Sequence, residues 1–532
     1  MSNEIRISKR ANTVKTSDCS SLSWEGVLFL PGKAEGETSA NEFLRLAIET
    51  GLESSVCRLK GLFFAVYQNP QGERFAFVDN CGYFFAYRSQ SLISTDFFDF
   101  LGSSCQLDLV GMTDLLREGG LFFDRTPIAG VSRIEADSII AAKPGASGFS
   151  TLSKGLAEVF KFESGLRPPE EIIAESLESF RGRKIALDLT GGLDTRLGLA
   201  FCLSAKIPFT AFSHGIPGHP DIEIPKRLAE LGGFEYRPLF IDPKSLPNDL
   251  PDMLASMDYL HNTACFHANY KMNQALLENG FDLRVQSGEA VLLRDFWMFS
   301  DWPFFRKQKP NLARVYSMRM RTKPHPQMFA GTLVEKLDRS YDTDMVNSLE
   351  NLYWRSPARL ANEAVAFQFR YRAGSGRVLT SANRQMPTLP LFCDYELMHS
   401  SANMPLSHKR MHRFFRDQVS SASPALARVK TDRGQSFRNS NSAILADNIV
   451  LFFDLIGRMA RKIRYRLVEK PMKRSLEPSE TAKLIRALPQ FPPALNTLQE
   501  AGLINSNLSA NKIPTGKIGN IIAAAEIIRR IS

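Results

Sequence analysis

The fold is decided by the stretch Lys184-Ile-Ala-Leu-Asp-Leu-Thr-Gly-Gly-Leu-Asp-Thr-Arg196. Its apolar first half predicts a buried strand, and a helical pattern begins at about Asp194, after two glycines. Glycine lets the backbone approach a bound anion without a Cβ clash, and a helix N-terminus offers N–H groups and partial positive charge to a phosphate. The stretch therefore predicts a phosphate-binding turn between a strand and a helix. An ordinary strand–turn–helix connection, with glycine for packing, is the alternative.

The turn also supplies side chains that suit a pyrophosphate. The hydroxyls of Thr190 and Thr195 can donate hydrogen bonds to phosphate oxygens, and the carboxylate of Asp194 is placed to bind Mg²⁺ on the pyrophosphate. The residues that we predict to bind ATP and pyrophosphate here are Leu189, Thr190, Gly191, Gly192, Leu193, Asp194 and Thr195, and Asp194 is also the predicted metal ligand.

Around this stretch, the apolar pattern divides the chain into three parts. Residues 1–160 contain short apolar runs, such as Leu62 to Tyr67 and Tyr83 to Tyr87, which predict a strand-rich domain. In residues 161–440, strands alternate with longer helical segments, as a parallel sheet with crossover helices requires. Residues 441–532 are a basic helical extension that begins with an amphipathic segment, in which apolar residues recur in steps of four and three: Leu445, Ile449, Phe452, Ile456, Met459 and Ile463.

Length and composition agree with several folded domains. The chain has 532 residues, 44% hydrophobic and 23% charged, and roughly 100–200 residues per domain gives two to four domains. No run of about 18 apolar residues occurs in the sequence, so we expect no membrane-spanning helix. The polar start MSNEIRISKRANT is not typical of a secretory signal, and seven scattered cysteines without a CxxC pair fit a reducing compartment. We therefore expect a cytoplasmic protein.

The turn resembles the SGGxDS pyrophosphate loop of the N-type ATP pyrophosphatases, with threonine in place of both serines. The segment Phe212-Ser-His-Gly-Ile-Pro-Gly-His-Pro-Asp221 resembles the second strand–turn–helix of asparagine synthetases, and this implies that Phe212, Ser213 and His214 contact adenine. Three further stretches resemble segments of that family in the same order: Gln286-Ser287-Gly288-Glu289, Leu389-Pro-Leu-Phe-Cys-Asp394 and Arg428-Val-Lys430. The resemblance covers about residues 180–440 and implies a doubly wound parallel α/β sheet of the adenine nucleotide α-hydrolase type.

The resemblance to asparagine synthetases also implies an ATP- and Mg²⁺-dependent ligase that forms AMP and pyrophosphate. A substrate carboxylate would attack the α-phosphate, and ammonia or an amine would then capture the acyl-adenylate. Lys430 would stabilise charge on the α-phosphate, Glu289 would accept a proton from the amine, and Ser287 and Gly288 would complete the ATP site. By residue type alone, Lys430 and Glu289 would be ordinary exposed residues.

One segment departs from the family pattern. After its SGE segment the family has a Gly-x-Asp-Glu stretch whose aspartate gives Mg²⁺ a second carboxylate, whereas this chain has Ala290-Val-Leu-Leu-Arg294-Asp295. Leu292 cannot bind a metal. Either Asp295 or Asp301 reaches the site, or Arg294 replaces part of the metal's charge, or the site is weakened. The last alternative would make the chain a nucleotide-binding pseudoenzyme or scaffold.

The first part of the chain resembles the class II glutaminase domain that precedes the synthetase in this family. The matching stretches include Leu59 to Tyr67 and Asp79-Asn-Cys-Gly82, and the resemblance implies an α+β sandwich of the N-terminal-nucleophile (Ntn) type over residues 1–160. The nucleophile of such domains is an N-terminal cysteine. This sequence begins with Met1, and Cys19 would serve only after removal of 18 residues. We therefore expect no glutamine hydrolysis.

Without glutamine hydrolysis, the nitrogen source is either ammonia or an amine of the substrate itself. The second alternative is found in the β-lactam synthetases and lasso-peptide cyclases, which share this architecture and form an amide within one molecule. The carboxylate would belong to a small molecule or a peptide. Whether the chain is a homodimer is left open.

The positive charge gathers in two segments. Seven Lys or Arg and no acidic residue lie between Trp302 and Val334, and eight Lys or Arg lie between Arg458 and Arg474 with Glu469 as the one acidic residue. Each segment can be a solvated face. The first can alternatively meet an anionic substrate or carrier, and the second can lie on an anionic membrane surface. We expect no nucleic-acid binding, because no recognised binding motif accompanies the charge.

Overall fold

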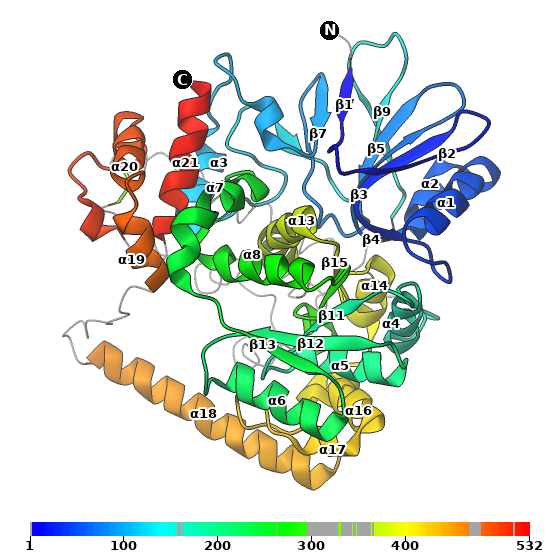
Figure 1. Cartoon of the computed structure of the whole chain (residues 1–532), viewed down its shortest axis with the longest axis vertical. Coiled ribbons are helices and arrows are strands. Elements are labelled where there is room, and N and C mark those ends of the chain that lie inside the picture. Colours follow the sequence, from blue (N-terminus) through cyan, green and yellow to red (C-terminus); the bar gives the residue numbers. More distant parts are fainter. Residues whose placement is uncertain are drawn as a thin grey trace.

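The computed structural model describes residues 3–156, 161, 163–261, 263–294, 328–330, 343, 347, 363, 367–467, 480–513 and 517–532 (Figure 1). This part of the chain is a mixed α/β fold with three sheets. Two sheets lie in the N-terminal part and one, which is parallel, lies in the middle of the chain. No helix of the described part is long and apolar enough to cross a membrane.

The N-terminal part is built on an antiparallel sheet with the strand order β10-β9-β5-β4-β3-β2. Its strands are β2 (Asn12–Lys15), β3 (Ser21–Phe29), β4 (Lys60–Gln68), β5 (Arg74–Val78), β9 (Ser138–Ala142) and β10 (Ser150–Ser153). Strand β4 is buried on both faces because almost every residue in it is apolar: Phe63 packs with helices α1 (Glu37–Thr50) and α2 (Leu52–Arg58), and Phe64 packs on the opposite side. The smaller sheet consists of β1 (Glu4–Arg6), β7 (Leu92–Ser94), β6 (Tyr87–Arg88) and β8 (Ser132–Arg133) in that order.

The strand predicted for Tyr83 to Tyr87 is wrong except at its last residue. Only Tyr87 lies in a strand, β6. The backbone N–H groups of Tyr83 and Phe84 donate to the buried Asp79 carboxylate at 3.2 and 2.7 Å, and the next N–H group donates to Thr380 Oγ1 at 3.0 Å. Because side chains take these donors, the segment cannot join a strand ladder.

The middle of the chain forms the parallel sheet that the sequence predicts. Its strand order is β13-β12-β11-β14-β15, and every neighbouring pair is parallel. The strands are β11 (Ile185–Asp188), β12 (Phe209–His214), β13 (Tyr236–Leu239), β14 (Leu283–Gln286) and β15 (Thr388–Pro390). Helix α5 (Asp194–Ser204) connects β11 to β12, and α6 (Pro220–Gly232) connects β12 to β13.

The strand order reverses between β11 and β14, the central strands of this sheet. Helices α7 (Leu246–Ser256) and α8 (Thr263–Glu278) come before β14 in the chain, and α13 (Gly376–Gln385) comes before β15. In open parallel sheets, ligands bind outside the carboxyl ends of the strands at such a reversal. The residues that follow β11 and β14 are therefore the place to look for a site.

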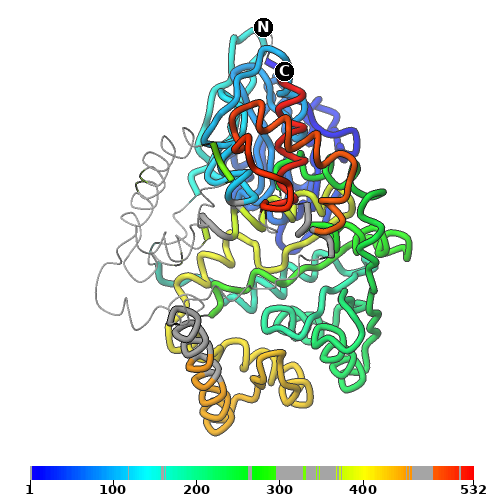
Figure 2. The backbone as a smooth tube through the Cα atoms, turned by 90° about the vertical axis from the view of Figure 1, so that its left-hand side faces the viewer, coloured from blue at the N-terminus to red at the C-terminus, as the bar shows by residue number. Residues whose placement is uncertain are grey.

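The last ninety or so residues lie in two different places, as Figures 1 and 2 show. Helix α18 (Asn441–Leu467) runs along the outer edge of the parallel-sheet part, where its Asp447 carboxylate pairs with Arg416. Helices α19 (Glu480–Ala487), α20 (Phe491–Glu500) and α21 (Ile518–Ile531) instead pack together beside α7 and α8, and α21 also contacts the N-terminal part. Ile521 and Ile528 of α21 share a core with Leu115 and Leu116, so α21 belongs to the main body rather than to an appended tail.

Candidate functional site

The predicted phosphate-binding turn follows β11 and ends at the first residue of α5. Its hydroxyls hold the turn itself together. Thr190 Oγ1 and Thr195 Oγ1 are 3.1 Å apart, Thr195 Oγ1 accepts from the Thr190 N–H at 3.1 Å, and the Gly192 N–H donates to Thr190 Oγ1 at 3.2 Å. These bonds fix the backbone, so the turn is formed before any ligand arrives. The turn includes the predicted residues Leu189, which is buried, and Leu193, which is half-buried.

Gly191 lies in the turn and contacts helix α6. Its N–H donates to Asp221 Oδ1 at 2.9 Å, and a Cβ at this position would lie 3.0 Å from Ile224 Cδ1. A side chain would therefore be crowded at this position, as the ordinary strand–turn–helix alternative expects. The Asp221 carboxylate already accepts a hydrogen bond from the Gly191 N–H, so this N–H can bind an anionic oxygen.

The carboxylate of Asp194 forms an ion pair with Arg294. Arg294 Nη2 lies 3.0 Å from Asp194 Oδ2, and the two side chains are only 11% and 15% exposed. Asp194 Oδ1 is also buried and has no hydrogen-bond partner among the described residues. Burial raises the pKa of Asp194, and the positive charges of Arg294 and Arg433 oppose that rise.

Mg²⁺ was predicted at Asp194, and the described residues do not form a metal site there on their own. No group of three His, Cys, Asp or Glu side chains that could hold a metal occurs in the part of the chain that the structure describes. The Asp194 carboxylate faces a guanidinium instead of a second carboxylate. The alternative ligands Asp295 and Asp301 lie outside the described residues. A metal carried in by ATP would meet one carboxylate, which is already paired.

The segment of Lys430 lies beside the turn, although about 230 residues separate the two in sequence. The Asp432 N–H donates to the Gly191 carbonyl at 3.1 Å. The buried Arg196 guanidinium of α5 donates to the Val429 carbonyl and lies 4.9 Å from the Phe437 ring centroid. Lys430 itself is exposed. The sequence therefore predicted the proximity of this segment, but not the arginine that anchors it.

A histidine, His412, lies within reach of the positive charges of Arg294 and Arg433. His412 stands at the start of α16 (Arg413–Ala422) and has a left-handed backbone conformation with φ of 56°. Burial and, to a smaller extent, the positive charges of Arg294, Arg416 and Arg433 together lower the pKa of His412 to about 3. His412 is therefore neutral near pH 7, and Arg294 and Arg433 carry the positive charge around Asp194. Sequence reasoning missed His412 and Arg433, because no motif marks them.

The predicted adenine contacts lie at the end of β12, next to β11. The Phe212 ring is 1% exposed and packs edge-on against Phe281 at 4.9 Å, so it is a core side chain and only its backbone can face a nucleotide. The Ser213 hydroxyl is buried and lies 2.6 Å from the Tyr236 hydroxyl. His214 is the exposed member of the three. Partial desolvation of its imidazole lowers the pKa of His214, and the Arg284 charge lowers it as well.

The residues after β14 approach α5 very closely. A Cβ on Gly198 of α5 would lie 2.6 Å from both Cβ and Oγ of Ser287, so only glycine allows this approach. Ser287 is 1% exposed, and Gly288 is exposed. Glu289 is half-buried, and its charge contributes to raising the pKa of Tyr83 and Cys393, so its carboxylate lies near the junction with the N-terminal part.

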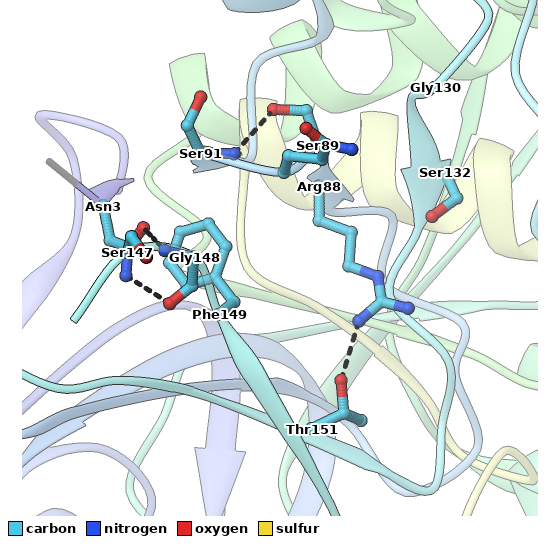
Figure 3. A pocket seen from close by; sticks show the side chains of 11 residues that line it. Asn3, Arg88, Ser89, Ser91, Gly130, Ser132, Ser147, Gly148, Phe149 and Thr151 are labelled. Atoms are coloured by element: carbon cyan, nitrogen blue, oxygen red, sulfur yellow. Dashed lines mark hydrogen bonds between the residues drawn. The ribbon is translucent and has the colours of Figure 1, made fainter. Parts of the chain in front are cut away.

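The N-terminal part contains a cavity of about 780 Å³ between the small sheet and the β9–β10 hairpin (Figure 3). Hydroxyl and amide groups supply most of its polar atoms, and Arg88 Nη1 donates to Thr151 Oγ1 at 3.0 Å across it. Cys19 is exposed in a turn before β3 and is not among the described lining residues.

The Asp79–Gly82 turn is structural. The carboxylate of Asp79 accepts backbone N–H groups from Cys81, Tyr83 and Phe84. The amide of Asn80 donates to the carbonyls of Val56 and Leu59 at 3.0 Å each. These bonds tie the end of β5 to the end of α2, so the Asn80 side chain stabilises the fold.

The geometry brings together the turn, Asp194, Arg294, Arg433 and the Lys430 segment at one edge of the parallel sheet. It leaves Glu289 toward the N-terminal part and the Phe212 ring in the core. No protein-family model and no curated protein matches this sequence, so the functional argument rests on these residues and their arrangement.

Proposed function

We propose that this chain is an ATP-dependent ligase that forms AMP and pyrophosphate while joining a carboxylate to ammonia or an amine. The proposal includes a parallel sheet of the adenine nucleotide α-hydrolase type and an Ntn-like N-terminal part that does not hydrolyse glutamine. The observation that supports it best is the preformed turn after β11, which stands where the strand order of the parallel sheet reverses and has Arg294 and Arg433 beside it.

In the proposed reaction, a carboxylate oxygen of the substrate forms a bond to the α-phosphorus, and the bond from that phosphorus to pyrophosphate breaks. The leaving pyrophosphate gains negative charge, so fixed cations nearby lower the barrier. Arg294, held by its ion pair with Asp194, is such a cation, and the exposed residues Lys430 and Arg433 lie on the loop that donates to Gly191. The amine nitrogen then attacks the acyl carbon, AMP leaves, and Glu289 accepts the proton from the amine.

A nucleotide-binding scaffold is the second candidate, because two groups of the turn already have protein partners. The Asp194 carboxylate is paired with Arg294, and the Gly191 N–H is bonded to Asp221. A turn whose polar groups are satisfied internally can persist without catalysis.

Exchange of labelled pyrophosphate into ATP separates the two candidates. The full chain is incubated with ATP, Mg²⁺, labelled pyrophosphate and one carboxylic acid at a time, and ATP binding is measured in parallel by calorimetry. We expect exchange with at least one carboxylate, lost in an Asp194→Ala variant. ATP binding without exchange from any carboxylate supports the scaffold. Absence of ATP binding contradicts both candidates.

A further inference from the structure

Helix α18 exposes a continuous apolar face. Five large apolar side chains in three turns of this helix are 44% to 66% exposed, and they are Leu445, Ile449, Phe452, Phe453 and Ile456. Four of them recur in steps of four and three residues, so they line one side of the helix. The rings of Phe452 and Phe453 lie 6.1 Å apart and form the centre of this face.

The opposite side of α18 is anchored on the body of the molecule. Ala443 and Ile444 are buried, and the Asp447 carboxylate forms an ion pair with Arg416 Nη2 at 2.9 Å and accepts from Ser436. The helix is therefore held with its apolar face outward, along the edge of the molecule in Figure 1. Apolar side chains exposed in a contiguous group, unlike isolated ones, mark an interaction surface.

The charge of α18 indicates which kind of surface covers its apolar face. The sequence from Gly457 to Leu467, the second half of α18, has five Lys or Arg and no acidic residue. Two copies packed in parallel would bring these basic halves together. Packed in antiparallel fashion, each basic half would meet a first half with two acidic residues, of which Asp447 is already paired with Arg416. An anionic surface would offer negative charge to all five basic residues, so it fits the second half of α18 better than a second copy of the helix does.

We propose that α18 lies on the surface of an anionic lipid membrane, with Phe452 and Phe453 in the boundary between headgroups and acyl chains. An apolar face beside a Lys- and Arg-rich segment is the pattern of helices that lie in the membrane interface. Each basic residue close to anionic lipid adds attraction that falls off within a Debye length. The proposal does not depend on the ligase reaction.

Sedimentation with lipid vesicles tests the proposal on the full chain. Vesicles of phosphatidylcholine mixed with phosphatidylglycerol are compared with vesicles of phosphatidylcholine alone. We expect binding to the mixed vesicles that weakens as salt is raised, and at least about tenfold weaker binding of a Phe452→Ser/Phe453→Ser double variant, because two aromatic side chains no longer enter the interface. The matched control is Phe240→Ser, which removes a 57% exposed phenylalanine outside α18 and should bind as the parent chain does.

Several results would overturn the proposal. They are absence of binding to the mixed vesicles, equal binding of the double variant, and an equal loss in the Phe240→Ser control. A parent chain that is dimeric by light scattering, becomes monomeric in the double variant and does not bind vesicles would assign the face to a second copy instead. Unchanged circular dichroism and melting temperature of the double variant ensure that lost binding reports on the surface.

Discussion

Arg294 Nη2 lies 3.0 Å from Asp194 Oδ2, and this ion pair joins the segment that follows β14 to the first residue of α5. The pair crosses the point where the strand order of the parallel sheet reverses. It places a fixed positive charge beside the turn, at a carboxylate that the sequence predicts as a metal ligand. If the turn binds phosphate as proposed, the Arg294 charge would act there in place of part of a metal's charge.

The stability of the pair can be measured with Arg294→Gln, Asp194→Asn and the double variant. Each single change leaves a largely buried charge without its partner, so we expect a loss of about 2–4 kcal/mol in the free energy of unfolding. The double variant should lose less than the sum of the two. Urea unfolding provides the three values, and strictly additive losses would show that the two groups do not interact.

Arg294→Gln should also weaken ATP binding by about tenfold or more, because one charge-assisted contact to phosphate is lost. Calorimetric titration of the folded variant gives the dissociation constant. Arg88→Gln, which changes the arginine of the N-terminal cavity, is the matched control and should bind ATP as the parent chain does. Equal effects of the two changes would remove Arg294 from the proposed ATP site.

His412 should make the chain less stable in acid. Its pKa in the folded state is lowered to about 3, whereas the unfolded chain has the ordinary value near 6.5. Between these values the unfolded state binds the extra proton, so the contribution of His412 to stability is present above pH 6.5 and is lost as the pH falls toward 3.

The check is urea unfolding of the parent chain and of His412→Gln at several pH values in this range. The difference between the two free energies should change as the pH falls from about 6.5 toward 3. A His412→Gln curve parallel to that of the parent chain would contradict the lowered pKa.

Gly198→Ala should destabilise the contact between α5 and the end of β14. The new methyl group would lie 2.6 Å from Ser287 Oγ, and overpacking of this kind costs about 1–3 kcal/mol. A Ser287→Gly change should recover part of the loss in the double variant. Gly102→Ala is the control, because nothing lies within 4 Å of its added Cβ. Thermal unfolding is measured for the parent chain, Gly198→Ala, the Gly198→Ala/Ser287→Gly double variant and Gly102→Ala. A Gly198→Ala variant as stable as Gly102→Ala would contradict the prediction.

The source of nitrogen gives a further prediction. We expect amide formation to proceed with ammonium and not with glutamine, and no release of glutamate from glutamine. Cys19→Ser should leave the reaction with ammonium unchanged, since Cys19 is an exposed turn residue with φ of 70°. Glutamate released by the parent chain and lost in Cys19→Ser would assign a catalytic role to this thiol.

Local patterns predicted the parallel sheet well. Ile185, Ala186 and Leu187 form an uninterrupted apolar run because β11 is buried on both faces, and such a run is recognisable without a partner strand. The two glycines and the start of α5 follow from the same stretch. The run from Tyr83 to Tyr87 looked equally like a strand, but Asp79 and Thr380 take its backbone donors, and no local pattern reports a bond to a residue almost 300 positions away.

The sequence by itself determined the alternation of β11, α5, β12 and α6, the glycine turn after β11 and the amphipathic spacing of α18, because these depend on neighbours within a few residues. Only the tertiary structure decided that Arg294 meets Asp194, that the Lys430 segment lies against Gly191, and that the stripe of α18 faces outward. Each of these depends on which distant elements pack together. Charge pairing and burial are properties of that packing, and local spacing cannot specify them.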